Sequence, residues 1–157
     1  MLGPRGVDIR ESSDIAARPP VVWLVVSEIE KWPDWNPICL QAKKLSEEIW
    51  RPGGQFEVTI ATTKDTYRLV LTVTEAEQGR RVGCRGKRLG FSTDFDIQID
   101  PVDGNSRVTI GATMRGPLLL LPWLAPAPDE VEQLTTVLLD SLKRESERRA
   151  RDLKEAI

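Results

Sequence analysis

Apolar and polar residues alternate repeatedly along the middle of this chain, and no other feature of the sequence constrains its fold as strongly. The alternation recurs in short segments bounded by turn-forming residues such as Asp103-Gly104-Asn105. A period of two is typical of strands with one buried face, and short turns between them favour an antiparallel meander. The alternating segments are residues 38–42, 56–62, 67–73, 82–86, 91–99 and 108–114.

A strand and two short helices are predicted before this meander. Residues 7–15 alternate and indicate a first strand. Pro19-Pro20 then opens an apolar helix, because proline suits the first helical turn, where its missing N–H has no acceptor. Pro33 and Pro37 restrict the next segment to a helical turn that breaks into an extended stretch.

A long amphipathic helix is predicted from Pro128, where proline and two acidic residues mark a helix start. Its apolar stripe consists of Val131, Leu134, Leu138 and Leu142. We expect this helix to pack on the sheet up to about residue 145 and to project past about residue 148. At 157 residues the chain has the length of one domain, so we predict one α+β domain over residues 7–157 after a disordered N-terminus of residues 1–6.

A single helix is too narrow to fill the concave face of a seven-stranded sheet, because its diameter is only about 10 Å. We therefore expect space between sheet and helix, lined by the inward-facing apolar side chains, and an apolar cavity is a ready site for an apolar small molecule. The residues predicted to bind such a ligand are Phe56, Val58, Ile60, Tyr67, Leu69, Leu71, Val82, Cys84, Phe91, Phe95, Ile97, Val108, Ile110, Ala112, Met114, Leu134 and Leu138.

The composition excludes several functions. With 22 basic and 24 acidic side chains the net charge is −2, which disfavours nucleic acid as the main partner. Histidine is absent, so serine–histidine and cysteine–histidine catalysis and histidine metal ligands are excluded. Two cysteines are too few for a disulfide scaffold or a zinc cluster. We expect neither a metal nor a cofactor.

Neither a secretion signal nor a membrane span is visible. The N-terminus MLGPRGVD lacks the apolar core of a signal peptide, and the longest apolar run, Leu118–Leu124, is far shorter than the ~20 residues that cross a bilayer. We therefore expect a cytoplasmic protein without stable membrane insertion. The same run, flanked by prolines, is a candidate for a lid over the cavity, for a homodimer contact or for core packing.

Four stretches of the chain together carry a family pattern: residues 18–37 with their Trp32-Pro33-Asp34-Trp35-Asn36-Pro37 ending, Trp50–Phe56, Val73–Val82 and Gly104–Thr109. In this order they resemble the polyketide cyclase/dehydrase and lipid-transport group of the START-like (SRPBCC) superfamily, over about residues 7–148. The resemblance implies a helix-grip fold, in which a seven-stranded antiparallel sheet wraps a long C-terminal helix around a hydrophobic cavity. It also implies two short helices between strands 1 and 2, which close one end of that cavity. Cys84 stands where relatives often carry tryptophan.

Binding or transport of a hydrophobic small molecule, such as a lipid, polyketide or isoprenoid, is the function favoured by the apolar inward faces and the resemblance. The alternative is a polyketide cyclase, aromatase or dehydratase that works without histidine, metal or cofactor. Tyr67 and Glu11 are its candidate proton-transfer groups, because both have inward parity. Thr62 and Thr93 are further inward polar residues.

Several of these residues also have a structural interpretation. The Tyr67 hydroxyl meets either a ligand or a backbone group. Glu11 is either a buried acid or reaches solvent from a frayed or bulged strand. Trp32 and Trp35 either guard the cavity mouth or anchor the short helices. Cys84 is interpreted as a small buried hydrophobe rather than a reactive thiol.

Overall fold

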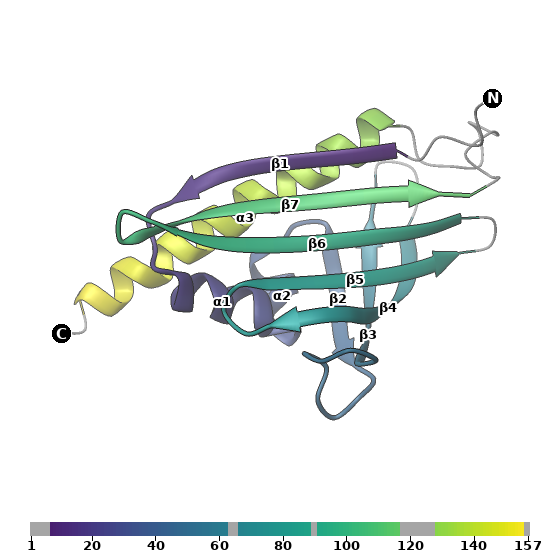
Figure 1. The fold of residues 1–157 in the computed structure, drawn as a ribbon, viewed down its shortest axis with the longest axis horizontal. Helices are drawn as coiled ribbons and strands as arrows, with labels where there is room; N and C mark the ends of the chain where they lie inside the picture. Colours follow the sequence, from purple (N-terminus) through teal and green to yellow (C-terminus); the bar gives the residue numbers. More distant parts are fainter. Residues whose placement is uncertain (1–6, 63–65, 89–90, 117–127, 156–157) are drawn as a thin grey trace.

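The computed structural model describes residues 7–62, 66–88, 91–116 and 128–155 and shows an antiparallel sheet wrapped around a long helix (Figure 1). It confirms the α+β helix-grip fold. Residues 1–6 and the Leu118–Leu124 run lie outside the described residues, and so do the predictions made for them. In chain order the elements are β1 (Val7–Ile15), α1 (Pro19–Ser27), the 3-10 turn η1 (Ile29–Lys31), α2 (Trp32–Trp35), β2 (Cys39–Lys44), β3 (Gln55–Ala61), β4 (Thr66–Glu77), β5 (Arg81–Arg88), β6 (Phe91–Val102), β7 (Asn105–Arg115) and α3 (Pro128–Glu155).

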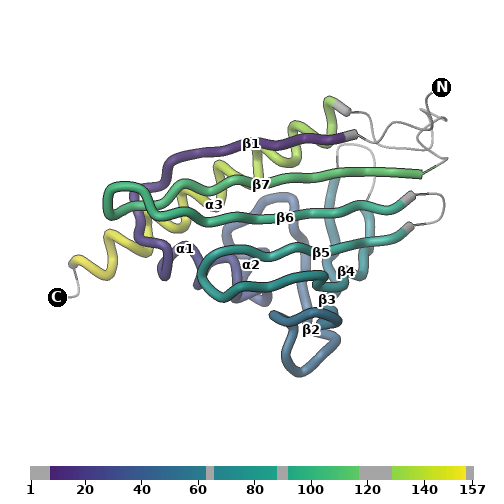
Figure 2. Tube along the Cα trace, viewed as in Figure 1, coloured from purple at the N-terminus to yellow at the C-terminus, as the bar shows by residue number. Residues whose placement is uncertain are grey.

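The seven strands form one antiparallel sheet in the order β1-β7-β6-β5-β4-β3-β2. In Figures 1 and 2, β1, β7, β6 and β5 run nearly side by side, whereas β2 and β3 run across them. A register shift in β4 between Val73 and Glu75 bends that strand, because a bulge increases local twist. The sheet therefore curves around the face on which α3 lies.

A second bulge overturns one sequence prediction. The alternation of Ile38, Leu40 and Ala42 predicts that all three point inward, but Leu40 is 55% exposed while Cys39 and Ala42 are buried. The pairing of β2 with β3 shifts between Cys39 and Gln41. One extra residue turns the following side chains to the other face of the sheet.

Two tryptophans attach α1 to the rest of the fold. The last carbonyl groups of a helix have no partner within the helix. Here the Trp32 indole N–H donates to the carbonyl of Val26 at 3.1 Å, and the Trp50 N–H donates to that of Ser27 at 2.9 Å. The Trp50 ring also packs 5.9 Å, centroid to centroid, from Trp23, which lies in the core.

The helix α3 packs along the inner face of the sheet and then against α1. Arg149 donates to the Glu28 carboxylate at 2.8 Å, and Ala150 still packs against the core. Packing therefore continues past the predicted limit of residue 145, because α1 covers the helix there; residues 151–154 are exposed. Within the described ranges, no helix is both long and apolar enough to cross a membrane. The buried residues of α3 are Val131, Thr135, Leu139, Ser141, Leu142 and Ser146.

The ion pairs around Arg149 should make stability depend on pH. Hydrogen bonds from Arg148 and then Arg149 hold the pKa of Glu145 below its ordinary value of 4.5. A carboxyl whose pKa is lowered by folding adds stability that is present above pH 4.5 and lost as the pH falls through the folded-state pKa. A Glu145→Gln variant should therefore lose about 1 kcal/mol of unfolding free energy at pH 7, measured by urea denaturation, and this deficit should shrink toward pH 3.

The matched control is Glu132→Gln, on the same helix. Glu132 is exposed and forms no ion pair within the part of the chain that the structure describes. This variant should follow the wild type at both pH values. A Glu145→Gln deficit of equal size at pH 7 and pH 3 would show that the carboxylate charge is not the cause.

Candidate functional site

A cavity of about 520 Å³ lies between the inner face of the sheet, the short helices and α3. This volume falls within the ~300–1,000 Å³ typical of small-molecule sites. Residues from β3 to β7 supply one wall, α3 supplies the opposite wall, and Val26 of α1 with Trp32 and Trp35 of α2 line one side. The cavity exists because a straight helix bridges a bent sheet without filling the bend.

Most of the residues predicted from parity border this cavity. Neighbouring strands bring them together through their register, which places Val58 opposite Leu69 and Cys84 opposite Phe95. Their role in ligand binding stays a prediction. The predicted residues that border the cavity are Phe56, Val58, Ile60, Tyr67, Leu69, Leu71, Val82, Cys84, Phe95, Ile97, Ile110, Met114, Leu134 and Leu138.

Three predicted residues are not part of this wall as described. Val108 and Ala112 have the inward parity but do not border the cavity; they are 0% and 2% exposed. Helices cover them, since α1 packs against β6 and β7 and Val131 of α3 shares a cluster with Ala112. The side chain of Phe91 lies outside the described part of the structure.

The segment between β1 and β3 contributes lining that strand parity does not reveal. Trp32 anchors α1 and also borders the cavity, while a role in guarding the cavity mouth stays a prediction. The sequence feature that could have revealed this lining is Trp32-Pro33-Asp34-Trp35. Proline breaks a helix, so tryptophans beside it indicate a compact aromatic turn rather than a strand. The lining residues from this segment are Val26, Trp32, Trp35, Asn36, Ile38, Cys39 and Trp50. Further lining residues from other parts of the chain include Thr62, Thr93, Glu130, Val131, Thr135 and Leu142.

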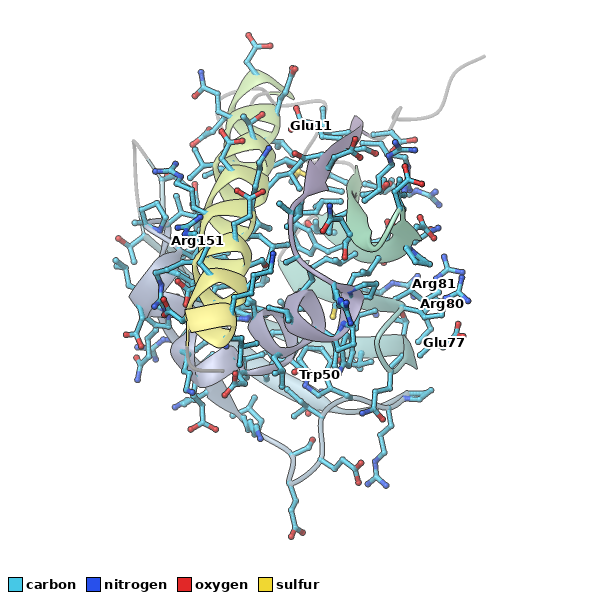
Figure 3. The ribbon with its side chains drawn as sticks, turned by 90° about the vertical axis from the view of Figure 1, so that its left-hand side faces the viewer. Glu11, Trp50, Glu77, Arg80, Arg81 and Arg151 are labelled. Atoms are coloured by element: carbon cyan, nitrogen blue, oxygen red, sulfur yellow. The ribbon has the colours of Figure 1, made fainter. Side chains whose placement is uncertain are left out.

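Glu11 does not border the cavity, which corrects its candidacy as a proton-transfer group. The strand β1 is the edge of the sheet and is regularly paired with β7, so an inward side chain there meets the flank of α3. The Thr136 hydroxyl lies 3.0 and 2.9 Å from the two carboxyl oxygens. Figure 3 shows Glu11 beside α3. Glu11 therefore links β1 to α3, and the strand around it is neither frayed nor bulged.

The tyrosine and the two cysteines of the chain border the cavity among mostly apolar side chains. Tyr67, the one tyrosine in the chain, is half-buried and lies opposite Ile60 on β3. Burial raises the pKa of the Cys84 thiol to about 12, and burial also raises the pKa of Cys39. At neutral pH both cysteines are therefore thiols rather than nucleophilic thiolates.

Two residues of the lining each carry a buried polar atom. The indole Nε1 of Trp35 and the carboxyl Oε1 of Glu130 are buried and have no hydrogen-bond partner among the described residues. Other polar groups of the lining are paired: the Thr135 hydroxyl donates to the Val131 carbonyl at 2.8 Å. The Asn36 side-chain oxygen accepts from the backbone N–H of Ile38 at 3.1 Å.

A second hollow, of about 690 Å³, lies outside the cavity, where the short helices meet the second half of α3. Its lining is charged and its cations are already paired. Lys31 lies 2.9 Å from a Glu28 oxygen, and Arg148 and Arg149 both contact Glu145. The interior cavity is therefore the stronger candidate for a ligand, because it offers apolar surface that nothing in the described structure covers.

The family of the chain is shown by a comparison with known sequences. A family model described as polyketide cyclase / dehydrase and lipid transport matches residues 6–147. The chain belongs to this family. The match spans the sheet, the short helices and most of α3, so it confirms the resemblance drawn from the four sequence stretches. No curated protein sequence matches the chain.

Solved structures with the same fold carry different names. The Zhui aromatase/cyclase from a Streptomyces species has a TM-score of 0.76 and 13% identity, over 92% of this chain and 95% of that chain. A START superfamily protein from Mycobacterium smegmatis has a TM-score of 0.69 and 18% identity, over 93% of this chain and 98% of that chain. A major latex-like protein from Panax ginseng has a TM-score of 0.71 and 12% identity, over 92% of this chain and 97% of that chain. At these identities the likeness shows the fold alone.

Proposed function

We propose that this protein binds or carries a hydrophobic small molecule of the lipid, polyketide or isoprenoid kind inside the cavity. The observation that carries the proposal is the largely apolar cavity of about 520 Å³ that lies between the sheet and α3. Each Å² of apolar ligand surface buried there gains about 25 cal/mol. Membership of a family described by lipid transport as well as by cyclase and dehydrase chemistry supports the same function.

The lining favours binding over catalysis. Asp96 borders the cavity, but its carboxylate pairs with Arg10 of β1 at 3.2 Å. The two buried cysteines stay protonated at neutral pH. Tyr67 and Glu130 are then the acid–base groups that the described lining offers to a substrate, and a cyclase or dehydratase would depend on them.

Native mass spectrometry of the protein purified from its host tests this proposal. A bound apolar molecule of constant mass, recovered unchanged after incubation with the protein, is the expected result. Recovery of a molecule lighter by one water would favour the dehydratase alternative. An empty cavity that also takes up no apolar probe would overturn the proposal.

A cavity-filling variant tests the location of binding. Cys84 is 8% exposed and borders the cavity from β5, so the indole of Cys84→Trp would occupy space that a ligand needs. We expect affinity for the fluorescent probe aminoanthracene to fall at least about 100-fold, or about 2.7 kcal/mol. The measurement is a fluorescence titration, with circular dichroism to establish that the variant is folded.

The control is Arg85→Trp, which adds the same side chain at the next position of the same strand but on the outer face. Arg85 is exposed and contacts Asp94 there at 2.7 Å. The affinity of this control for aminoanthracene should equal that of the wild type. Equal losses in both variants would place the probe outside the cavity. If Cys84→Trp does not fold, Leu138→Trp fills the cavity from the α3 side.

A further inference from the structure

Gly86 of β5 stands on the inner face of the sheet, where the strand carries no side chain. Val82 and Cys84 share that face and border the cavity, whereas Gly86 is buried and does not border it. The backbone at Gly86 lies outside the left-handed region, so its conformation does not require glycine. Glycine weakens the interior of a strand and often marks the close approach of other atoms.

Two leucine side chains of β4 occupy the space beside Gly86. The register places Leu71 directly opposite Gly86, and Leu69 is the preceding residue of β4 on the same face. A Cβ added to Gly86 would lie 3.0 Å from a methyl carbon of each leucine, closer than the ~3.5–4.0 Å at which carbon atoms pack. Both leucines border the cavity, and they therefore connect Gly86 to the cavity wall.

A side chain at position 86 would displace the two leucines toward the cavity. The added atoms would stand on the inner face, as Cys84 does two residues earlier, and the backbone of β5 lies behind them. Movement across β5 toward β6 is blocked by Thr93, which lies opposite Gly86 and is buried. Because protein interiors are close-packed, the open volume beside the leucines is the cavity itself. Glycine therefore leaves the cavity deeper at this place.

We propose that Gly86 is a positioning residue that sets how bulky a ligand the cavity accepts, because it lets Leu69 and Leu71 lie against β5. This inference rests on the proposed function and adds a size limit to it. The preference that it predicts is for apolar molecules too large for a cavity without this depth.

Fluorescent probes of graded size test the proposal: aminonaphthalene, aminoanthracene and aminochrysene, with two, three and four fused rings. Wild-type affinity should rise along this series, because a larger probe buries more apolar surface. Gly86→Val should bind aminonaphthalene within about twofold of the wild type and should lose at least about tenfold in affinity for aminochrysene, since only the larger ring system overlaps the displaced leucines. Circular dichroism establishes that the variant is folded. If it is not, Gly86→Ala should show the same order with smaller losses.

The matched control is Gly83→Val, the same substitution in the same strand on the outer face. A Cβ there would lie 3.0 Å from side-chain atoms of Thr74 and Glu75, so the cavity should be unchanged and the wild-type size profile kept. A compensating variant tests the role of the leucines. Gly86→Val combined with Leu69→Ala removes the displaced side chain and should restore the affinity for aminochrysene to within about threefold of the wild type.

Losses of equal size for all three probes in Gly86→Val would show damage to the fold and overturn this inference, while leaving the binding function intact. The same graded loss in Gly83→Val would also overturn it. So would a graded loss that neither Leu69→Ala nor Leu71→Ala reverses, or a wild-type affinity that does not rise with probe size. Failure of the wild type to bind any of the three probes would overturn the proposed function together with this inference.

Discussion

A Phe56→Ala variant is expected to lose about 3–5 kcal/mol of its free energy of unfolding. The Phe56 side chain is 1% exposed, and its ring centroid lies 5.6 Å from that of Trp32 and 5.8 Å from that of Trp50. Truncation removes both aromatic contacts and merges the emptied volume with the cavity beside it. Since the two tryptophans are tied to α1 by hydrogen bonds, they cannot collapse into the space.

Urea denaturation followed by tryptophan fluorescence measures this loss, which is a large share of the ~5–15 kcal/mol that stabilises a typical domain. The control is Leu24→Ala in α1, where the side chain is 51% exposed and the change should stay within about 0.5 kcal/mol. A Phe56→Ala loss below about 1 kcal/mol would show that the aromatic cluster does not hold α1 on the sheet.

A Gly54→Ala variant is expected to lose about 3 kcal/mol, for a different reason. A Cβ at Gly54 would meet the backbone carbonyl oxygen of Ile49, and backbone cannot move aside as a flexible side chain can. The turn is also fixed from both sides. The Gly54 N–H donates to Arg51 at 2.9 Å, and the Gly54 carbonyl accepts from Val73 of β4 at 2.7 Å.

Gly53→Ala is the matched control for this turn. Gly53 has φ of +91° but no atom within 4 Å of an added Cβ, so alanine there meets only the backbone penalty of about 1–2 kcal/mol. Thermal and urea unfolding of the two variants should therefore differ clearly. Equal destabilisation would mean that backbone conformation, and not the contact with Ile49, explains why glycine stands at position 54.

The alternation of side chains predicts the sheet and most of the cavity wall because both depend on local geometry. In a regular strand every second residue faces the same side, so Val58, Leu71 and Ile97 could be placed on the inner face before any pairing was known. The same rule fails at Leu40. The bulge in β2 that turns this residue outward depends on the pairing with β3, which local alternation does not contain.

The interpretation of Glu11 was wrong for a related reason. Its parity is inward, as predicted, but inward means the cavity only for the central strands. Because β1 pairs with β7 at the edge of the sheet, the inner side of Glu11 faces Thr136 on α3. Conversely, Glu130 was not predicted to border the cavity, since a helix start in sequence does not show which side of the first turn faces a distant sheet.

The element types, the inward parity of the strands and the family could all be predicted from the amino-acid sequence, because they depend on short-range periodicity and local motifs. The path of α3 across the sheet could not, and that path sets how much volume stays open between helix and sheet. Contacts of this kind join residues that are far apart along the chain, as with Glu11 and Thr136. Their meeting depends on the curvature of the whole sheet, which no short stretch of sequence encodes.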